Sequence, residues 1–347
     1  MISLQTAPRQ RPQYITGYVT SHAGSVPVVS TRLARRDITG GWKVRWDIGR
    51  SSYAVLAGLY AVGSPDNLSP VLVTANYKLT FDTLRRELGG VSAWILVLDT
   101  KGVNVWCAAG KGTFGTRELE QRMMAVRLAE VVSHRTLILP QLGATGVSAP
   151  EVKRATGWQV KYGPVRARDI PSYLSHGSKK DDAMRRVQFR APDRMAVVPT
   201  ELVHAWPLVL GILLASALLG LPFDAGYIGR LLAACLPLLG AVIVGALVFP
   251  ALLPYIPFRA FALKGALLGA LWGIAMSLIM RASLLGTVAL TLMAMPIVSF
   301  LSMNFTGSST FTSQPGAALE VKRGLIPVIS SVGVGLGLSV AIRILSL

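Results

Sequence analysis

The chain has 347 residues, enough for two domains, and its 35 Lys and Arg against 17 Asp and Glu give a formal net charge of +18. This charge would suit a nucleic-acid-binding protein, but the sequence shows no helix-turn-helix pattern and no basic stripe with interleaved aromatic residues. Its two cysteines, Cys107 and Cys235, exclude a disulfide framework, and they exclude an iron–sulfur cluster held by this chain alone, which would need about four thiolates.

The N-terminal segment mixes Pro, Ser, Arg and Gly without a regular hydrophobic period. We therefore expect residues 1–40 to form an irregular lead-in to the first domain. The polar run from Thr6 to Arg11 gives no sign of a cleavable signal peptide. No chemistry can be assigned to this segment.

From residue 41 to residue 175 the sequence alternates between short apolar strands and amphipathic helices. This alternation is typical of an α/β domain in which helices cover both faces of a mainly parallel sheet, so we expect a Rossmann-like fold. In the longest helix Leu119, Met123 and Val126 share one apolar face, as packing on a sheet requires. The expected strands are 55–62, 71–74, 94–99, 137–139 and 158–162, and the expected helices are 116–132, 149–156 and one that begins at Thr80 or Asp82 and ends at Leu88.

The stretch from Asn104 to Thr116 follows the strong strand that ends at Asp99. It therefore lies where open α/β sheets usually bind ligands, outside the carboxyl ends of the strands. Its glycines match the dinucleotide pattern GxGxxG by letter, but they come well after the strand, and no acidic residue follows the next strand. A Walker phosphate loop is also excluded, because Lys111 is followed by glycine and not by Ser or Thr.

Cys107 is the other possible chemical centre of this stretch. A short helical cap from Trp106 to Ala109, ended by Gly110, would present its thiol, and Lys111 is close enough in sequence to favour a thiolate. The common role of a lone cysteine is different, because most such residues are buried and behave as small apolar side chains.

The run Asn-Val-Trp-Cys-Ala-Ala-Gly-Lys at 104–111 resembles the signature of HgcA, the membrane corrinoid protein family of microbial mercury methylation. The resemblance implies a cobalamin-type corrinoid whose cobalt has the Cys107 thiolate as its lower axial ligand. It implies methyl transfer to Hg(II), with the methyl group supplied by a methyl-tetrahydrofolate-linked donor system. It also implies reduction by a ferredoxin-like partner with two 4Fe–4S clusters. The implied contacts with the corrinoid are Asn104, Val105, Trp106, Cys107, Ala108, Gly110 and Lys111.

Two further segments, 71–82 and 157–164, are similar to the corrinoid-binding domain in the large subunit of the corrinoid iron-sulfur protein of acetyl-CoA synthesis. Carried over by position, Thr74 and Thr80 would contact the corrinoid, the first at the end of a strand and the second at the start of a helix. Ordinary capping is the competing role for both threonines. That large subunit also has a cysteine-rich cluster domain, which this sequence lacks, and the difference favours the mercury-methylation family.

Residues 176–203 form a charged linker, rich in Lys and Arg, and residues 204–347 contain a series of apolar runs. Each run is near the ~20 residues that span a bilayer, so we expect a transmembrane domain of five helices. The excess of Lys and Arg on the linker side predicts a multi-pass inner-membrane protein with a cytoplasmic α/β domain and a cytoplasmic polar loop at 304–323. The intramembrane glycines would allow close helix packing. The expected spans are 205–221, 228–248, 261–280, 283–301 and 325–345.

Two other functions remain open at the level of sequence. One is a membrane-anchored corrinoid methyl carrier for another acceptor, since the sequence shows no recognisable mercury-binding thiol pair. The other is a membrane-tethered nucleotide-binding or scaffolding module, which would contain no cobalt and no visible chromophore. No nucleic-acid partner is expected in either case.

Overall fold

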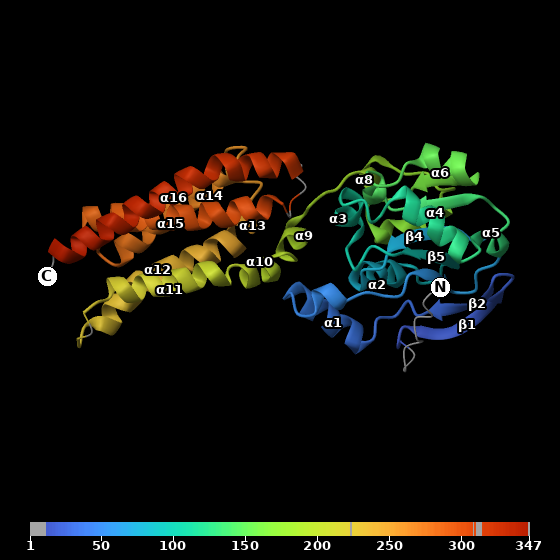
Figure 1. Cartoon of the computed structure of the whole chain (residues 1–347), viewed down its shortest axis with the longest axis horizontal. Helices are drawn as coiled ribbons and strands as arrows, with labels where there is room; N and C mark the ends of the chain where they lie inside the picture. The colour runs from blue at the N-terminus through green and yellow to red at the C-terminus, as the bar shows by residue number, and fades with distance from the viewer. Residues whose placement is uncertain (1–11, 223, 308, 310–313, 346–347) are drawn as a thin grey trace, which may run out of the picture. The chain divides into compact units, whose positions relative to one another are not determined.

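A computed structural model describes residues 12–222, 224–307, 309 and 314–345 and shows two compact units (Figure 1). The described residues up to Val44 form one unit with Ile48–Val187, which we call the α/β unit. Arg45–Asp47 and the described residues from Gln188 onward form the other, which we call the helical unit. The chain passes from the first to the second within the expected linker, 176–203.

A seven-stranded mixed sheet organises the α/β unit, with the strand order β1-β2-β3-β5-β4-β6-β7. The four strands β5, β4, β6 and β7 are parallel, so their carboxyl ends share one edge. β3 is antiparallel to β5 and β1 is antiparallel to β2, so the expectation of a mainly parallel sheet holds only for that four-stranded part. The strands are β1 (Ile15–Ser21), β2 (Gly24–Val29), β3 (Gly58–Val62), β4 (Val71–Ala75), β5 (Ala93–Leu98), β6 (Thr136–Leu139) and β7 (Gln159–Tyr162).

The lead-in is not irregular, because it contains the hairpin of β1 and β2 and the helix α1 (Arg35–Arg45). In β1 no side chain is fully buried, and half-buried residues alternate with exposed ones. An edge strand of this kind carries little apolar sequence, so its two-residue period is weak. The prediction for residues 1–40 is therefore wrong over this part, while residues 1–11 lie outside the described residues.

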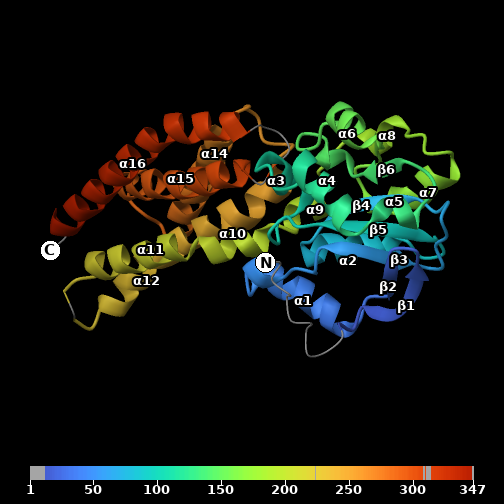
Figure 2. The same ribbon diagram turned by 45° about the vertical axis from the view of Figure 1, so that its right-hand side comes forward.

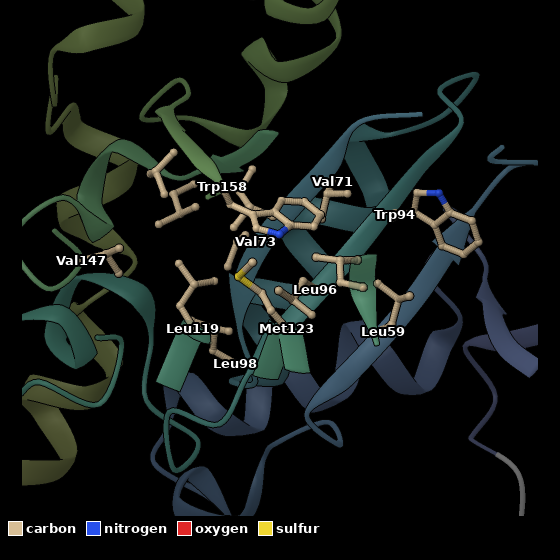
Figure 3. Close-up of a cluster of buried hydrophobic side chains, with 14 of the residues drawn as sticks. Leu59, Val71, Val73, Trp94, Leu96, Leu98, Leu119, Met123, Val147 and Trp158 are labelled. Carbon is tan, nitrogen blue, oxygen red and sulfur yellow. The ribbon is translucent and has the colours of Figure 1, made fainter. Parts of the chain in front are cut away.

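Two hydrophobic cores, one on each face of the sheet, hold the α/β unit together. Successive strand residues point to opposite faces, so Val71 and Val73 join one core and Leu72 joins the other. Figure 3 shows the first core, where Leu119 and Met123 pack over the sheet. Helices α3, α4 and α6 contribute residues to this core, whereas α2 contributes to the second core on the other face of the sheet. The helices are α2 (Lys78–Glu87), α3 (Val105–Gly110), α4 (Thr116–Ala125), α5 (Leu128–Val131), α6 (Ala149–Thr156) and α7 (Ile170–Ser175).

Most helix positions in this unit agree with the sequence prediction, and α6 has the predicted bounds. The predicted helix 116–132 is instead two helices, because Arg127 adopts a left-handed φ of 51° and breaks the hydrogen-bond ladder. Val126 caps the end of α4 and packs, half-buried, against the same core as Leu119 and Met123, as its assignment to the apolar face predicts. The predicted strand 55–62 is shorter at its start, since β3 begins at Gly58.

A buried ionic network joins α1 to α2. The guanidinium of Arg85, which is fully buried, donates to Asp37 at 2.8 Å and to Asp82 at 2.8 Å. The ammonium of Lys78 donates to the same two carboxylates, at 2.6 Å and 2.5 Å. Arg85 also donates to the carbonyl of Ser30 at 2.5 Å, so the chain that follows β2 is fixed to α2.

The helical unit contains four helices that are long and apolar enough to cross a membrane, or five if a bent pair is counted as one span. The expected span 205–221 corresponds to α11 (Trp206–Leu219), whose 14 residues reach only about 21 Å, short of the ~30 Å hydrocarbon layer. It is long enough to cross a bilayer only when it is counted together with Ala191–His204, from which it is bent by 50°. The four spans are Tyr227–Leu252, Phe261–Ile279, Leu284–Thr306 and Gly316–Leu345.

These spans lie side by side in Figures 1 and 2, where α12 (Tyr227–Ile243), α14 (Phe261–Ile279), α15 (Leu284–Thr306) and α16 (Gln314–Leu345) are labelled. Because α15 continues to Thr306 and α16 begins at Gln314, the expected loop 304–323 is mostly helical. The described residues between the two helices are 307 and 309, and the others lie outside the described part.

Glycines at four-residue intervals let α14 and α15 pack with their backbones in contact. A Cβ placed on Gly265, Gly269 or Gly273 would lie 2.6–2.7 Å from a backbone Cα of α15. Real Cβ atoms do not approach other atoms so closely, so only glycine fits at these three positions. The predicted role of glycines in close packing of the apolar helices is confirmed for these three.

We expect Gly269→Val to force α14 and α15 apart and to lower the thermal unfolding midpoint of the detergent-solubilised protein by several degrees. Overpacking a close contact typically costs about 1–3 kcal/mol, and here the obstacle is backbone rather than a flexible side chain. Gly333→Val in α16 is the matched control, because a Cβ at that position meets nothing within 4 Å. Equal midpoints for the two variants would contradict the packing argument.

Candidate functional site

Cys107 lies on the outer side of the short helix α3, and its side chain is exposed. Asn104 is the N-cap: its side-chain oxygen accepts a hydrogen bond from the Cys107 N–H at 3.0 Å. The Nδ2 group of the same side chain donates to the Cys107 Sγ at 3.4 Å. The capping residue therefore fixes the start of the helix and also orients the sulfur.

The inner side of α3 is apolar and anchors the helix to the sheet. Val105, Ala108 and Ala109 are buried in the core that covers this face. Trp106, which is 39% exposed, and Gly110 lie with Cys107 on the outer side. The period of the helix thus separates a core-facing side from an exposed side within six residues.

Asn76, the first residue after β4, holds the loop that leads from β5 to α3. Its buried side-chain oxygen accepts hydrogen bonds from the Thr100 N–H at 3.1 Å, the Thr100 hydroxyl at 2.8 Å and the Gly102 N–H at 2.9 Å. Its amide donates to Asp99 at 3.1 Å. Four hydrogen bonds of one side chain therefore hold the loop 99–102, which leads into Asn104 and Cys107.

On its other side α3 packs closely against the loop that follows β6. A Cβ on Gly146 would lie 2.1 Å from the carbonyl oxygen of Phe114 and 2.9 Å from the Cα of Ala109. A Cβ on Gly143 would lie 2.5 Å from the ring of Phe114, which is fully buried. Gly146 thus allows the loop and the Cys107 helix to meet backbone to backbone, and Gly143 leaves room for the ring of Phe114.

This edge of the sheet is also its topological switch point. The loop after β4 leads to α2 on one face, whereas the loop after the neighbouring strand β6 leads to α6 on the other face. Connections that diverge in this way leave a crevice outside the carboxyl ends of the strands, where open α/β sheets bind ligands. The loop carrying Cys107 follows β5, the next strand along, at the same edge.

The structure corrects the placement of the two threonines. Thr74 is buried inside β4, which continues to Ala75, and strand alternation places its side chain on the α2 face with Leu72. Thr80 does not begin a helix, because α2 starts at Lys78, and its side chain is half-buried. α2 packs on the sheet face opposite to the one that α3 covers, and the contact of Thr74 and Thr80 with a corrinoid stays a prediction.

Lys111 is exposed, and its backbone N–H donates to the carbonyl of Cys107 at 3.0 Å. A different lysine, Lys101, pairs with Asp99 at the end of β5, donating to its carboxylate at 2.5 Å. Burial alone would raise the pKa of Asp99, but the hydrogen bonds from Lys101 lower it below the ordinary value. Asp99 is therefore an ionised structural carboxylate. The effect of Lys111 on the thiol stays a prediction.

Sequence reasoning missed the supporting residues Asn76, Gly143 and Gly146. An Asn directly after a strand is the only local signal for the first of them. Within the described residues no group of three or more His, Cys, Asp or Glu side chains is arranged to hold a metal ion. Cys107 would thus contribute one ligand to a metal.

Residues 48–174 match the family model described as CO dehydrogenase/acetyl-CoA synthase delta subunit. Over 127 residues the chain is 33% identical to the gamma subunit of the acetyl-CoA decarbonylase/synthase complex of Methanopyrus kandleri and to that of Archaeoglobus fulgidus. The corresponding subunit of Methanothermobacter thermautotrophicus is 35% identical over 127 residues. Each match covers 36% of this chain and 27% of the relative, so the chain spans about a quarter of these relatives. The matches support the resemblance of the α/β unit to the corrinoid-binding domain of this family.

Proposed function

We propose that the α/β unit binds a corrinoid at the carboxyl edge of its parallel strands and that Cys107 supplies an axial ligand to the cobalt. The observation that carries the proposal is the presentation of Cys107: exposed, on a capped helix, with its sulfur oriented by Asn104. A buried structural cysteine would show none of these features. Cys235, which is 5% exposed, is such a residue.

The residues around the sulfur fit a flat macrocycle. A corrin ring already supplies the equatorial ligands of its metal, so a site with one thiol suffices. Gly110, Lys111 and Gly112 follow Cys107 and are exposed, so these three residues would present no bulky apolar side chain to a flat ligand, and Trp106 is exposed on the same side of α3. The hydrogen bond from Asn104 Nδ2 to Sγ would act on the ligand in the way that outer partners of metal ligands usually do, by fixing its orientation.

The finer proposal is methylation of Hg(II), which rests on the eight-residue signature at 104–111. When bound, the corrinoid would carry the methyl group on its cobalt. A thiolate from Cys107 would donate charge to the metal and favour release of the methyl group to an electrophile. The chain has too few cysteines for its own cluster, so a ferredoxin-like partner would supply electrons. A methyl-tetrahydrofolate-linked system would supply the methyl group.

A second candidate function is methyl transfer to another acceptor. The matched relatives are subunits of a complex named for acetyl-CoA decarbonylation and synthesis, and they favour methyl carriage without pointing to mercury. In both cases we propose that the apolar helices anchor the chain in the inner membrane, with the corrinoid domain on the cytoplasmic side. The arginines that precede the first apolar helix support this orientation.

The test is to purify the full chain in detergent and to measure its cobalt content and visible spectrum. We expect about one cobalt per chain and a corrinoid absorption spectrum. Absence of both after supply of corrinoid would reject the cofactor and favour a scaffolding or nucleotide-binding module. Methylmercury formation by cells with and without the gene then separates the two acceptors. If the protein binds cobalt but the cells form no methylmercury, the remaining function is that of a methyl carrier for another acceptor.

A further inference from the structure

Helix α1 has an unusual surface for a helix that packs on an α/β sheet. It lies beside α2 at the margin of the α/β unit (Figures 1 and 2) and buries only Asp37, Gly41 and Val44. Among its outward residues are Ile38, which is 50% exposed, and Trp42, which is 67% exposed. These two are four positions apart, so they lie on the same side of the helix.

Ile48 extends the apolar surface beyond the end of α1. Its side chain is 61% exposed, and its backbone N–H donates to the carbonyl of Lys43 in α1 at 2.9 Å. Singly exposed apolar residues are ordinary, but Ile38, Trp42 and Ile48, together with the 43% exposed Trp46, make four large ones within eleven positions. A patch of this size calls for an occupant. We call Ile38, Trp42 and Ile48 the α1 patch.

The charges around the α1 patch are mostly basic. Arg35, Arg36 and Lys43 are exposed, whereas the neighbouring Asp47 is 35% exposed and lies 3.2 Å from His204. The acidic residue of α1 does not offset them, because Asp37 points inward and is paired with Lys78 and Arg85. The outer face of this helix thus presents a tryptophan and isoleucines beside arginines and a lysine.

We propose that α1 is an interfacial helix that lies on the anionic surface of the bilayer, with the α1 patch in the headgroup region. This rests on the membrane anchoring proposed above. Tryptophan favours the interface between headgroups and hydrocarbon, and Lys and Arg bind anionic headgroups. A nucleic acid would match the charge but would leave the exposed isoleucines in water. An acidic protein partner is the remaining alternative, and the experiment below separates it from the bilayer.

The contact has a consequence for the site. The buried network of Asp37, Lys78, Asp82 and Arg85 joins α1 rigidly to α2. A bilayer that holds α1 would therefore orient the whole α/β unit, and with it the sheet edge that carries Cys107. The membrane would fix the direction in which this edge faces the cytoplasm.

The experiment uses the full chain in vesicles of phosphatidylcholine and phosphatidylglycerol whose acyl chains are brominated near the glycerol. Bromine quenches tryptophan fluorescence at short range, and the signal of Trp42 is obtained as the difference between wild type and Trp42→Phe. We expect this difference signal to lose most of its intensity in brominated vesicles. Leu68→Trp is the matched control, because Leu68 is 70% exposed between β3 and β4 and should give an unquenched signal.

Charge and anchoring are tested in the same samples. A triple variant in which Arg35, Arg36 and Lys43 are each replaced by glutamine should show weaker quenching of Trp42 in anionic vesicles. Trp206 and Trp272 of the helical unit report insertion independently of α1. If they are quenched while Trp42 is not, the proposal for α1 is wrong and the anchoring stands. If none is quenched, both are wrong. If Trp42 is unquenched by the brominated lipid and becomes shielded from water only when a soluble protein partner is added, the α1 patch binds that partner and the bilayer proposal is wrong.

Discussion

Replacing Cys107 by alanine should abolish most methyl transfer to Hg(II) while the protein still folds and inserts. The side chain is exposed, and its sulfur accepts a hydrogen bond from Asn104 at 3.4 Å, so alanine removes little packing. Alanine also suits the interior of a helix. The loss should therefore appear in methylmercury formation and in the visible spectrum, and not in the thermal unfolding midpoint.

Cys235→Ala is the matched control and should show the opposite pattern. Cys235 is buried in α12, so its removal should lower the stability of the helical unit and leave methyl transfer unchanged. Undiminished activity of Cys107→Ala with an unchanged spectrum would remove the thiol from the mechanism.

Cys107→His separates ligation from charge. A neutral imidazole can coordinate cobalt but donates less charge than a thiolate, so we expect cobalt to be retained and methyl transfer to be slow. Cobalt content and the transfer rate are measured on the same preparation. A histidine variant that transfers as fast as wild type would show that Cys107 is an anchor and that thiolate donation does not drive the reaction.

The parts of the fold that sequence predicts well are those fixed by local pattern. β4, β5 and β6 are continuous apolar runs, as strands buried on both faces must be, and α6 has a proline near its start and Gly157 at its end. The start of α2 depends on tertiary structure instead. The isolated bridge between Ala54 and Tyr77 fixes the residue before the helix, and nothing near Thr80 in the sequence reports it.

The same distinction holds for the candidate site. The helical cap, its end near Gly110 and the outward Cys107 follow from neighbouring residues, and the structure confirms them. The support from Asn76 and Gly146 comes from loops after other strands, so it exists only once the sheet is assembled. The face on which Thr74 lies also depends on strand register, which similarity by position does not report.

The buried network between α1 and α2 predicts a large loss of stability for Asp37→Asn. The substitution preserves the shape of the side chain but replaces a carboxylate by an amide beside the guanidinium of Arg85. Arg85 is fully buried, and it would keep only one of its two carboxylate partners, Asp82. Breaking a buried ion pair from one side typically costs about 3–5 kcal/mol. For a unit of this size we expect the midpoint of its thermal unfolding to fall by about 10 °C. The fluorescence of the buried Trp94 and Trp158 would report this unfolding.

The pH dependence of the wild type and of this variant gives the sharper test. Burial alone would raise the pKa of Asp37, but hydrogen bonds from Lys78 and the Ala34 N–H, with the Lys78 charge, lower it below the ordinary value. The folded state therefore binds this proton less readily than the unfolded chain. The stabilisation is complete above the ordinary carboxyl pKa and is lost as pH falls through the lowered one.

Asp37→Asn should accordingly remove part of the acid sensitivity of the α/β unit, so that the two stability curves converge at low pH. Asp169→Asn is the control. Its carboxylate is 28% exposed and 3.7 Å from Arg168, and a surface pair of this kind contributes at most about 1 kcal/mol. This control should reproduce the wild-type curve. A constant gap between wild type and Asp37→Asn down to acid pH would show that the variant acts through packing alone and that the network does not depend on the charge of Asp37.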